Sequence, residues 1–238
     1  MMNFYEDKNI KSAYYSLIGE NHIKQSCENQ DSICCEVISQ SKWVIAVADG
    51  VSSARFAKKG SHFATEVVKE LANEFELTDQ LNLDELKVWF VRKWKSKISS
   101  DWNEYASTIN FAYYSNNYLL VGQIGDGLIC VDIDGKKKAF GIDEEFYTSE
   151  TYALGEVVKK NSFILNLERV KSNISLYMVS DGIGKEIDYD SRLELGVYLG
   201  ILLLQDKEHI EEEIMSWLDA LNNKNGDDKS IAFINWEV

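Results

Sequence analysis

The sequence predicts an α+β fold in which two packed antiparallel sheets are covered by helices. Strand-like apolar runs cluster along the chain, and several are joined by turns of only a few residues. Strands joined by such short turns must pair antiparallel. The helix-like segments come in pairs instead of alternating one by one with strands, and this argues against a doubly wound parallel sheet.

The N-terminal half is expected to form a hairpin followed by two helices. Positions 63, 67 and 71 are apolar at the four-residue spacing of one helix face. Asn82 and Glu85 have the spacing of a capping box, which places a helix start there. In order, we expect a strand over 13–18, a hairpin of 33–38 with 43–48, a helix over 61–75 and a second helix from 82.

The C-terminal half returns to strands and closes with a helix pair and one more strand. Asp134-Gly135 lies between two short strand-like runs and is typical of a two-residue hairpin turn. The stretch 143–160 is looser, and we expect a short flap there. We expect strands over 108–114, 118–123, 128–133, 138–142, 162–167, 175–180 and 230–236, and helices over 191–204 and 207–221.

Composition narrows the function classes. The chain has 39 acidic against 25 basic residues, a net charge of −14. A body this acidic repels phosphate backbones and anionic lipids, so nucleic-acid and membrane roles are disfavoured. The longest apolar stretch is too short to span a bilayer. No secretory signal is visible and the cysteines lack a CxxC pair, so we expect a cytoplasmic protein with reduced thiols.

Four strongly apolar runs adjoin an acidic residue that has a glycine beside it. The acidic residues are Asp49, Asp126, Asp181 and Asp227. A rigid strand holds a carboxylate at its end in place, and glycine allows a sharp turn or close approach of a ligand. Carboxylates gathered at one end of a fold repel one another unless a cation neutralises them. The pattern therefore predicts a site for a hard metal ion.

The order of these motifs resembles the metal-dependent serine/threonine protein phosphatases (protein phosphatase type 2C), especially their compact bacterial members. The matching pieces run in family order from about Tyr14 to the C-terminus: GENHIKQSCENQDS, VIAVADGVSSARFAKKGSHFATEVV, ASTINFAYY, LLVGQIGDGLICV, LYMVSDGIG and NGDDKSIAFI. The resemblance implies a single catalytic domain over 1–238 with a four-layer α-β-β-α sandwich. It also implies metal-dependent hydrolysis of phosphoserine and phosphothreonine in proteins by a metal-activated hydroxide at a two-metal centre.

The resemblance further implies a role for each acidic residue. Asp49 would bridge two Mn²⁺ or Mg²⁺ ions, and the Gly50 carbonyl would add a ligand. Asp181 and Asp227 would hold the second ion. Asp126 matches a position that helps to bind a third, weaker ion. All-oxygen ligation favours Mg²⁺ or Mn²⁺ over zinc or copper.

Asp31 falls where the family places an acidic residue around metal-bound water, but the residues near it depart from the family pattern. Ser26 stands where an arginine would grip phosphate, and Val51 stands where a histidine often donates a proton. Gln30 and Asp228 also replace the usual Glu and Asn. We hypothesise that His22 or Lys24 takes over phosphate contact or proton donation, because both lie in the loop before Asp31. A purely structural histidine is the competing interpretation of His22.

Three functions remain open on the sequence alone. The first is an active phosphatase that acts on a phosphorylated protein substrate, with a cognate Ser/Thr kinase as a further expected partner. The second is a catalytically weak relative that binds phosphoproteins or regulates a partner, suggested by the missing arginine and histidine. The third is a sandwich stabilised structurally by Ca²⁺, which leaves the ordered motifs unexplained.

Overall fold

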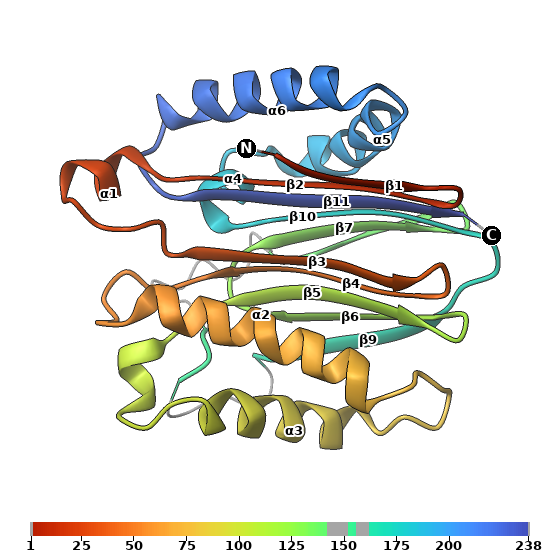
Figure 1. The fold of residues 1–238 in the computed structure, drawn as a ribbon, viewed down its shortest axis with the longest axis horizontal. Helices are drawn as coiled ribbons and strands as arrows, with labels where there is room; N and C mark the ends of the chain where they lie inside the picture. The colour runs from red at the N-terminus through yellow and green to blue at the C-terminus, as the bar shows by residue number, and fades with distance from the viewer. Residues whose placement is uncertain (1, 142–151, 156–161, 238) are drawn as a thin grey trace.

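Two antiparallel sheets lie face to face in the computed structural model, and helices cover their outer faces (Figure 1). The structure describes residues 2–141, 152–155 and 162–237. A six-stranded sheet has the order β1-β2-β11-β10-β7-β8, and a five-stranded sheet has the order β3-β4-β5-β6-β9. Neighbouring strands pair antiparallel throughout both sheets. The predicted fold class is confirmed.

The elements have the following bounds. The strands are β1 (Asn3–Asp7), β2 (Ile10–Leu17), β3 (Asp31–Ser39), β4 (Lys42–Asp49), β5 (Ile109–Ser115), β6 (Tyr118–Ile124), β7 (Leu128–Ile133), β8 (Lys136–Phe140), β9 (Ile164–Arg169), β10 (Asn173–Val179) and β11 (Lys229–Glu237). The helices are α1 (Glu20–Lys24), α2 (Ala57–Glu74), α3 (Leu83–Ser96), α4 (Asp181–Gly184), α5 (Arg192–Leu202) and α6 (Lys207–Asn222), with 3-10 turns η1 (Trp102–Tyr105) and η3 (Tyr189–Ser191). In the described part of the chain, none of the helices is long and apolar enough to cross a membrane.

Every strand and helix expected from the sequence has its counterpart, most of them with shifted ends. The Asn82 side chain caps α3 by accepting from the backbone N–H groups of Asp84 and Glu85, as its position predicted. Strand β1 was not predicted, because its sequence NFYED is largely polar and it lies at a sheet edge. The short helices α1 and α4 were also missed. Of the predicted flap, only 152–155 lies among the described residues.

Three apolar layers hold the sandwich together. One lies between the two sheets, and the other two lie between each sheet and its helices. Strand β4 contributes to two of them, because successive side chains point to opposite faces. Trp43, Ile45 and Val47 face the other sheet, whereas Val44, Ala46 and Ala48 face the α2–α3 layer. Each large apolar side chain buried in this way contributes about 1.5–3 kcal/mol.

Candidate metal centre

Asp31 and Asp49 lie opposite each other at one end of the five-stranded sheet. The register pairs Asp31, the first residue of β3, with Asp49, the last residue of β4. The backbone of Asp49 is fixed on its other side by Thr108, whose N–H donates to the Asp49 carbonyl at 2.7 Å. The Ser107 hydroxyl donates to the same carbonyl at 2.9 Å. The Asp49 carboxylate therefore projects from a rigid strand end.

Gly50 follows Asp49 at a point where no side chain fits. Its N–H donates to the Gln30 carbonyl at 3.2 Å, which continues the pairing beyond Asp49. A Cβ on Gly50 would lie 2.4 Å from the Ala57 carbonyl oxygen. The glycine is required because the start of α2 packs directly on this backbone.

Asp181 and Asp227 reach the same end from the six-stranded sheet. Asp181 opens α4 directly after β10, and Asp227 precedes β11, the antiparallel neighbour of β10. A Cβ on Gly182 would lie 2.1 Å from the Asp228 carbonyl oxygen. Glycine at position 182 thus lets α4 pack against the backbone that carries Asp227.

Ser180 joins the two halves of the cluster. Its hydroxyl donates to Asp31 Oδ2 at 2.9 Å and accepts from the Ser230 N–H at 3.0 Å. Ser180 therefore ties a residue of the five-stranded sheet to two strands of the six-stranded sheet. The other carboxylate oxygen of Asp31, Oδ1, is buried without a hydrogen-bond partner, as is Oδ1 of Asp181.

The pKa values show how tightly these carboxylates are crowded. Burial, followed by the charges of Asp31, Asp181 and Asp227, raises the pKa of Asp49 well above its ordinary value. Burial, together with the charge of Asp228, raises the pKa of Asp31 to about 7, against the hydrogen bonds that lower it. Burial and then the charge of Asp181 raise the pKa of Asp227. The cluster is deficient in positive charge.

One lysine supplies part of that charge. Lys185 lies one helical turn after Asp181, and its Nζ donates to Asp181 Oδ2. The same Nζ lies 3.8 Å from Oδ2 of Asp126, the residue that precedes Gly127 and β7. Asp126 therefore joins the cluster through Lys185, on the side of the six-stranded sheet.

His22 lies beside the cluster but pairs with a different acid. Its Nδ1 is 2.8 Å from Asp228 Oδ2, and the His22 side chain is buried. The Asp228 carboxylate also accepts from the N–H groups of Gly19 at 2.7 Å and Gln30 at 2.6 Å. His22 thus supports the backbone directly before Asp31. Lys24 is exposed and pairs with Glu20.

The side chains present fit a hard cation by their chemistry. Among the described residues, no three His, Cys, Asp or Glu side chains are arranged as a preformed metal cage. The cluster nevertheless offers only oxygen donors, two of its buried carboxylate oxygens lack a partner, and its charges repel one another. Oxygen donors of this kind suit Mg²⁺ and Mn²⁺. Neutralisation by such ions would remove the repulsion.

The sequence predicted that Asp49, Asp126, Asp181 and Asp227 would meet, and the structure brings them to one end of the sandwich. Lys185 and the supporting role of Asp228 were not identified from the sequence. The spacing of four residues between Asp181 and Lys185 was the available signal, because it places both on one side of a helical turn.

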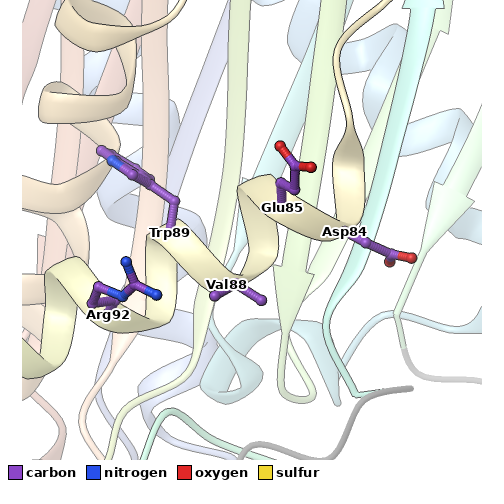
Figure 2. Close-up of a pocket in the computed structure, with 5 residues that line it drawn as sticks. All are labelled: Asp84, Glu85, Val88, Trp89 and Arg92. Carbon is purple, nitrogen blue, oxygen red and sulfur yellow. The ribbon is translucent and has the colours of Figure 1, made fainter.

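A hollow on the surface of α3 lies apart from this cluster (Figure 2). It is lined by Asp84, Glu85, Val88, Trp89 and Arg92. All five belong to the outer helix layer, and none is a predicted ligand. The hollow therefore has no part in the candidate centre.

Solved structures share the fold over nearly the whole chain. The structure of RsbX in complex with magnesium has 14% identity, covers 100% of both chains and gives a TM-score of 0.66. The catalytic domain of the serine/threonine protein phosphatase PstP in complex with two manganese ions has 16% identity, with 97% of this chain and 99% of that chain covered, and a TM-score of 0.66. Stp1 from Staphylococcus aureus has 15% identity, 95% coverage of both chains and a TM-score of 0.64.

At the level of sequence the chain matches a family but no individual relative. No curated protein matches the chain. The family model of protein phosphatase 2C matches residues 18–225. That span contains Asp31, Asp49, Asp126 and Asp181 and ends just before Asp227 and Asp228. That span and the shared fold lead to one conclusion: the chain belongs to the protein phosphatase 2C family.

Proposed function

We propose that the chain hydrolyses phosphoserine and phosphothreonine in proteins, with two Mn²⁺ or Mg²⁺ ions as cofactors. The observation that carries the proposal is the convergence of Asp31, Asp49, Asp181 and Asp227 from two sheets into one crowded cluster. Family membership supports a protein phosphatase function. The magnesium and manganese named in the RsbX and PstP structures support the choice of ions.

Each residue has a distinct part in this proposal. Asp49 and the Gly50 carbonyl, together with Asp181 and Asp227, would hold the ions. When bound, such ions lower the pKa of water and offset negative charge on phosphoryl oxygens. The buried Oδ1 of Asp31 has no hydrogen-bond partner and would accept a hydrogen bond from a water admitted together with the ions.

His22 is proposed as a positioning residue. Through Asp228 it fixes the N–H of Gln30 and hence the start of β3, where Asp31 lies. Because its Nδ1 is engaged with Asp228 and its side chain is buried, phosphate contact by His22 would need a different arrangement of this pair. The physiological substrate is expected to be a phosphorylated protein, with the kinase that modifies it as a functional partner.

Hydrolysis of p-nitrophenyl phosphate and of a phosphothreonine peptide tests the proposal. We expect turnover with Mn²⁺ or Mg²⁺ and none in excess chelator. Asp49→Asn and Asp181→Asn should each lose at least about 100-fold in kcat/KM, the upper end of what outer-shell partners cost. Asp134→Asn is the matched control, because it changes an Asp-Gly sequence outside the cluster and should keep wild-type activity.

The outcomes separate the candidate functions. Equal losses in Asp134→Asn and Asp49→Asn would contradict the assignment of the centre. Manganese binding without turnover on either substrate would favour the catalytically weak, phosphoprotein-binding alternative. Stabilisation by Ca²⁺ alone would favour a structural ion.

A further inference from the structure

Lys185 stands out among the basic side chains that the structure describes, because its ammonium group pairs with two carboxylates of the candidate centre. It donates to Asp181 Oδ2 and lies 3.8 Å from Asp126 Oδ2. The Lys185 side chain is 54% exposed, that of Asp126 is 30% exposed and that of Asp181 is 11% exposed, so the ammonium group reaches from the surface to a carboxylate that is largely buried.

The local backbone holds Lys185 in this place. Its N–H donates to the Asp181 carbonyl at 3.0 Å, which closes one helical turn. The Asn225 side chain donates to the Gly182 carbonyl at 3.1 Å and to Glu186 Oε1 at 2.8 Å, which fastens this turn to the loop before β11. The lysine is therefore attached to the cluster by a short and braced segment.

The other lysine near the cluster is used differently. Lys229 is fully buried, and its Nζ donates to Asn222 Oδ1 and to the carbonyl oxygens of Asn225 and Asp227. Its hydrogen-bonding capacity is spent on neutral oxygens of the loop. Lys229 therefore organises the backbone, and the direct countercharge to the carboxylates falls to Lys185.

We propose that Lys185 is a tethered cation that occupies the space between Asp126 and Asp181, so that this pair takes up no metal ion of its own. The inference rests on the proposed two-ion centre. It differs from the expectation of a third, weaker ion at Asp126, because the ammonium group already neutralises the charge of that carboxylate. Lys185 acts as a positioning residue for Asp181.

The physical basis is competition between a tethered and a free cation. Asp126 and Asp181 repel each other unless a positive charge lies between them. A group on a short tether acts at an effective concentration in the mM range or above. A metal ion that binds weakly at Asp126 and Asp181 must displace the ammonium group at that effective concentration. Removing the ammonium group removes this competitor.

Counting bound Mn²⁺ by equilibrium dialysis gives the first test. We expect two ions on the wild-type chain and three on Lys185→Gln, with the additional ion lost again in Lys185→Gln/Asp126→Asn. Lys24→Gln is the matched control, because Lys24 also pairs with an acid four residues earlier, Glu20 at 2.7 Å, but Glu20 is exposed whereas Asp181 is buried. It should leave the count at two. Equal counts for the wild type and Lys185→Gln, with ions bound to both, would overturn the inference.

Thermal unfolding in excess chelator gives the second test, which needs neither metal nor turnover. We expect Lys185→Gln to lower Tm by about 2–4 °C, and added Asp126→Asn to restore part of that loss. No restoration by Asp126→Asn would overturn the inference whatever the ion count. If the wild-type chain binds no Mn²⁺ and hydrolyses nothing, the proposed function fails, and the unfolding measurement alone decides the role of Lys185.

Discussion

Strand β7 runs between two Asp-Gly sequences that lie at opposite ends of the sandwich and have opposite surroundings. At the far end, the Asp134 carboxylate accepts from the N–H groups of Lys171 at 2.9 Å, Ser172 at 2.8 Å and Asn173 at 3.1 Å. Burial acts to raise its pKa, but these hydrogen bonds outweigh burial and lower the pKa to about 2. Asp134 is satisfied by the protein itself.

At the near end, Asp126 adjoins carboxylates that have few donors and many like charges. Asp31, Asp49 and Asp227 all have raised pKa values. The same dipeptide thus serves as a turn at one end and joins a cation-requiring cluster at the other. The difference teaches that the donors around an acidic residue, more than the motif that contains it, decide between a structural and a chemical role.

The largest expected effect is on the pH dependence of stability without metal. The pKa of Asp31 is about 7 in the folded chain against an ordinary value of 3.8. Between these values the folded state holds a proton that the unfolded state releases, so the stability that Asp31 contributes is fully present below about pH 4 and is lost as pH rises to 7. The slope for one proton reaches about 1.4 kcal/mol per pH unit. Urea unfolding in chelator at pH 5 and pH 8 measures it.

Asp31→Asn should weaken that dependence, because the amide does not titrate, although Asp49 and Asp227 keep raised pKa values. Asp134 should act in the opposite direction and in a separate window: its lowered pKa adds stability above about pH 4 that is lost as pH falls towards 2. A urea midpoint that increases from pH 5 to pH 8 in chelator would break the comparison between the two ends.

The next effect separates two neighbours within the near end. Asp228 accepts two backbone N–H groups and contacts His22, whereas Asp227 is crowded by Asp181. Asp228→Asn leaves one buried N–H without its acceptor and should cost about 1–3 kcal/mol. Asp227→Asn keeps Oδ1 as the acceptor of the Asp228 N–H and removes a repelling charge, so it should be neutral or stabilising in chelator.

Urea denaturation of both variants in chelator measures this difference. His22→Ala serves as the third member, because it removes one partner of Asp228 but leaves both N–H contacts in place. Its loss of stability should be smaller than that of Asp228→Asn. Equal losses of stability for Asp227→Asn and Asp228→Asn would show that the backbone N–H donors do not explain the difference between the two residues.

Much of the fold could be predicted because its elements carry strong local patterns. Strand β7 begins and ends at the predicted residues, since an apolar run lies between two glycine-containing turns. Helix α2 begins at Ala57, before the predicted 61, and its first residue packs on Gly50. The sequence did not predict this first turn because it carries no apolar stripe of its own. Strand β1 gains its place by pairing with β2, and no local pattern announces that.

The candidate site was predictable in its acids but not in its cations. A carboxylate at the end of an apolar strand can be recognised locally, as with Asp49. The pairing of His22 with Asp228 joins residues 206 positions apart. Lys185 looks like an ordinary helical lysine until Asp126 is brought beside it. Contacts of this kind depend on tertiary structure, so one sequence read by itself does not reveal them.

The smallest expected effect on the metal centre belongs to Asp134→Asn, and it isolates what the far end contributes. Asp134 has a φ of 52° and Gly135 has a φ of 82°, the left-handed conformations of a two-residue hairpin turn, which Asn-Gly adopts as readily. The turn should therefore survive, and only the charge and the contact to the Lys171 N–H are lost. We expect a cost of about 1 kcal/mol at neutral pH, measured by urea denaturation, with Mn²⁺ binding unchanged by equilibrium dialysis. A change in Mn²⁺ binding would show that the two ends of β7 are coupled, and the contrast between satisfied and unsatisfied acids would then no longer explain why only one end forms a metal centre.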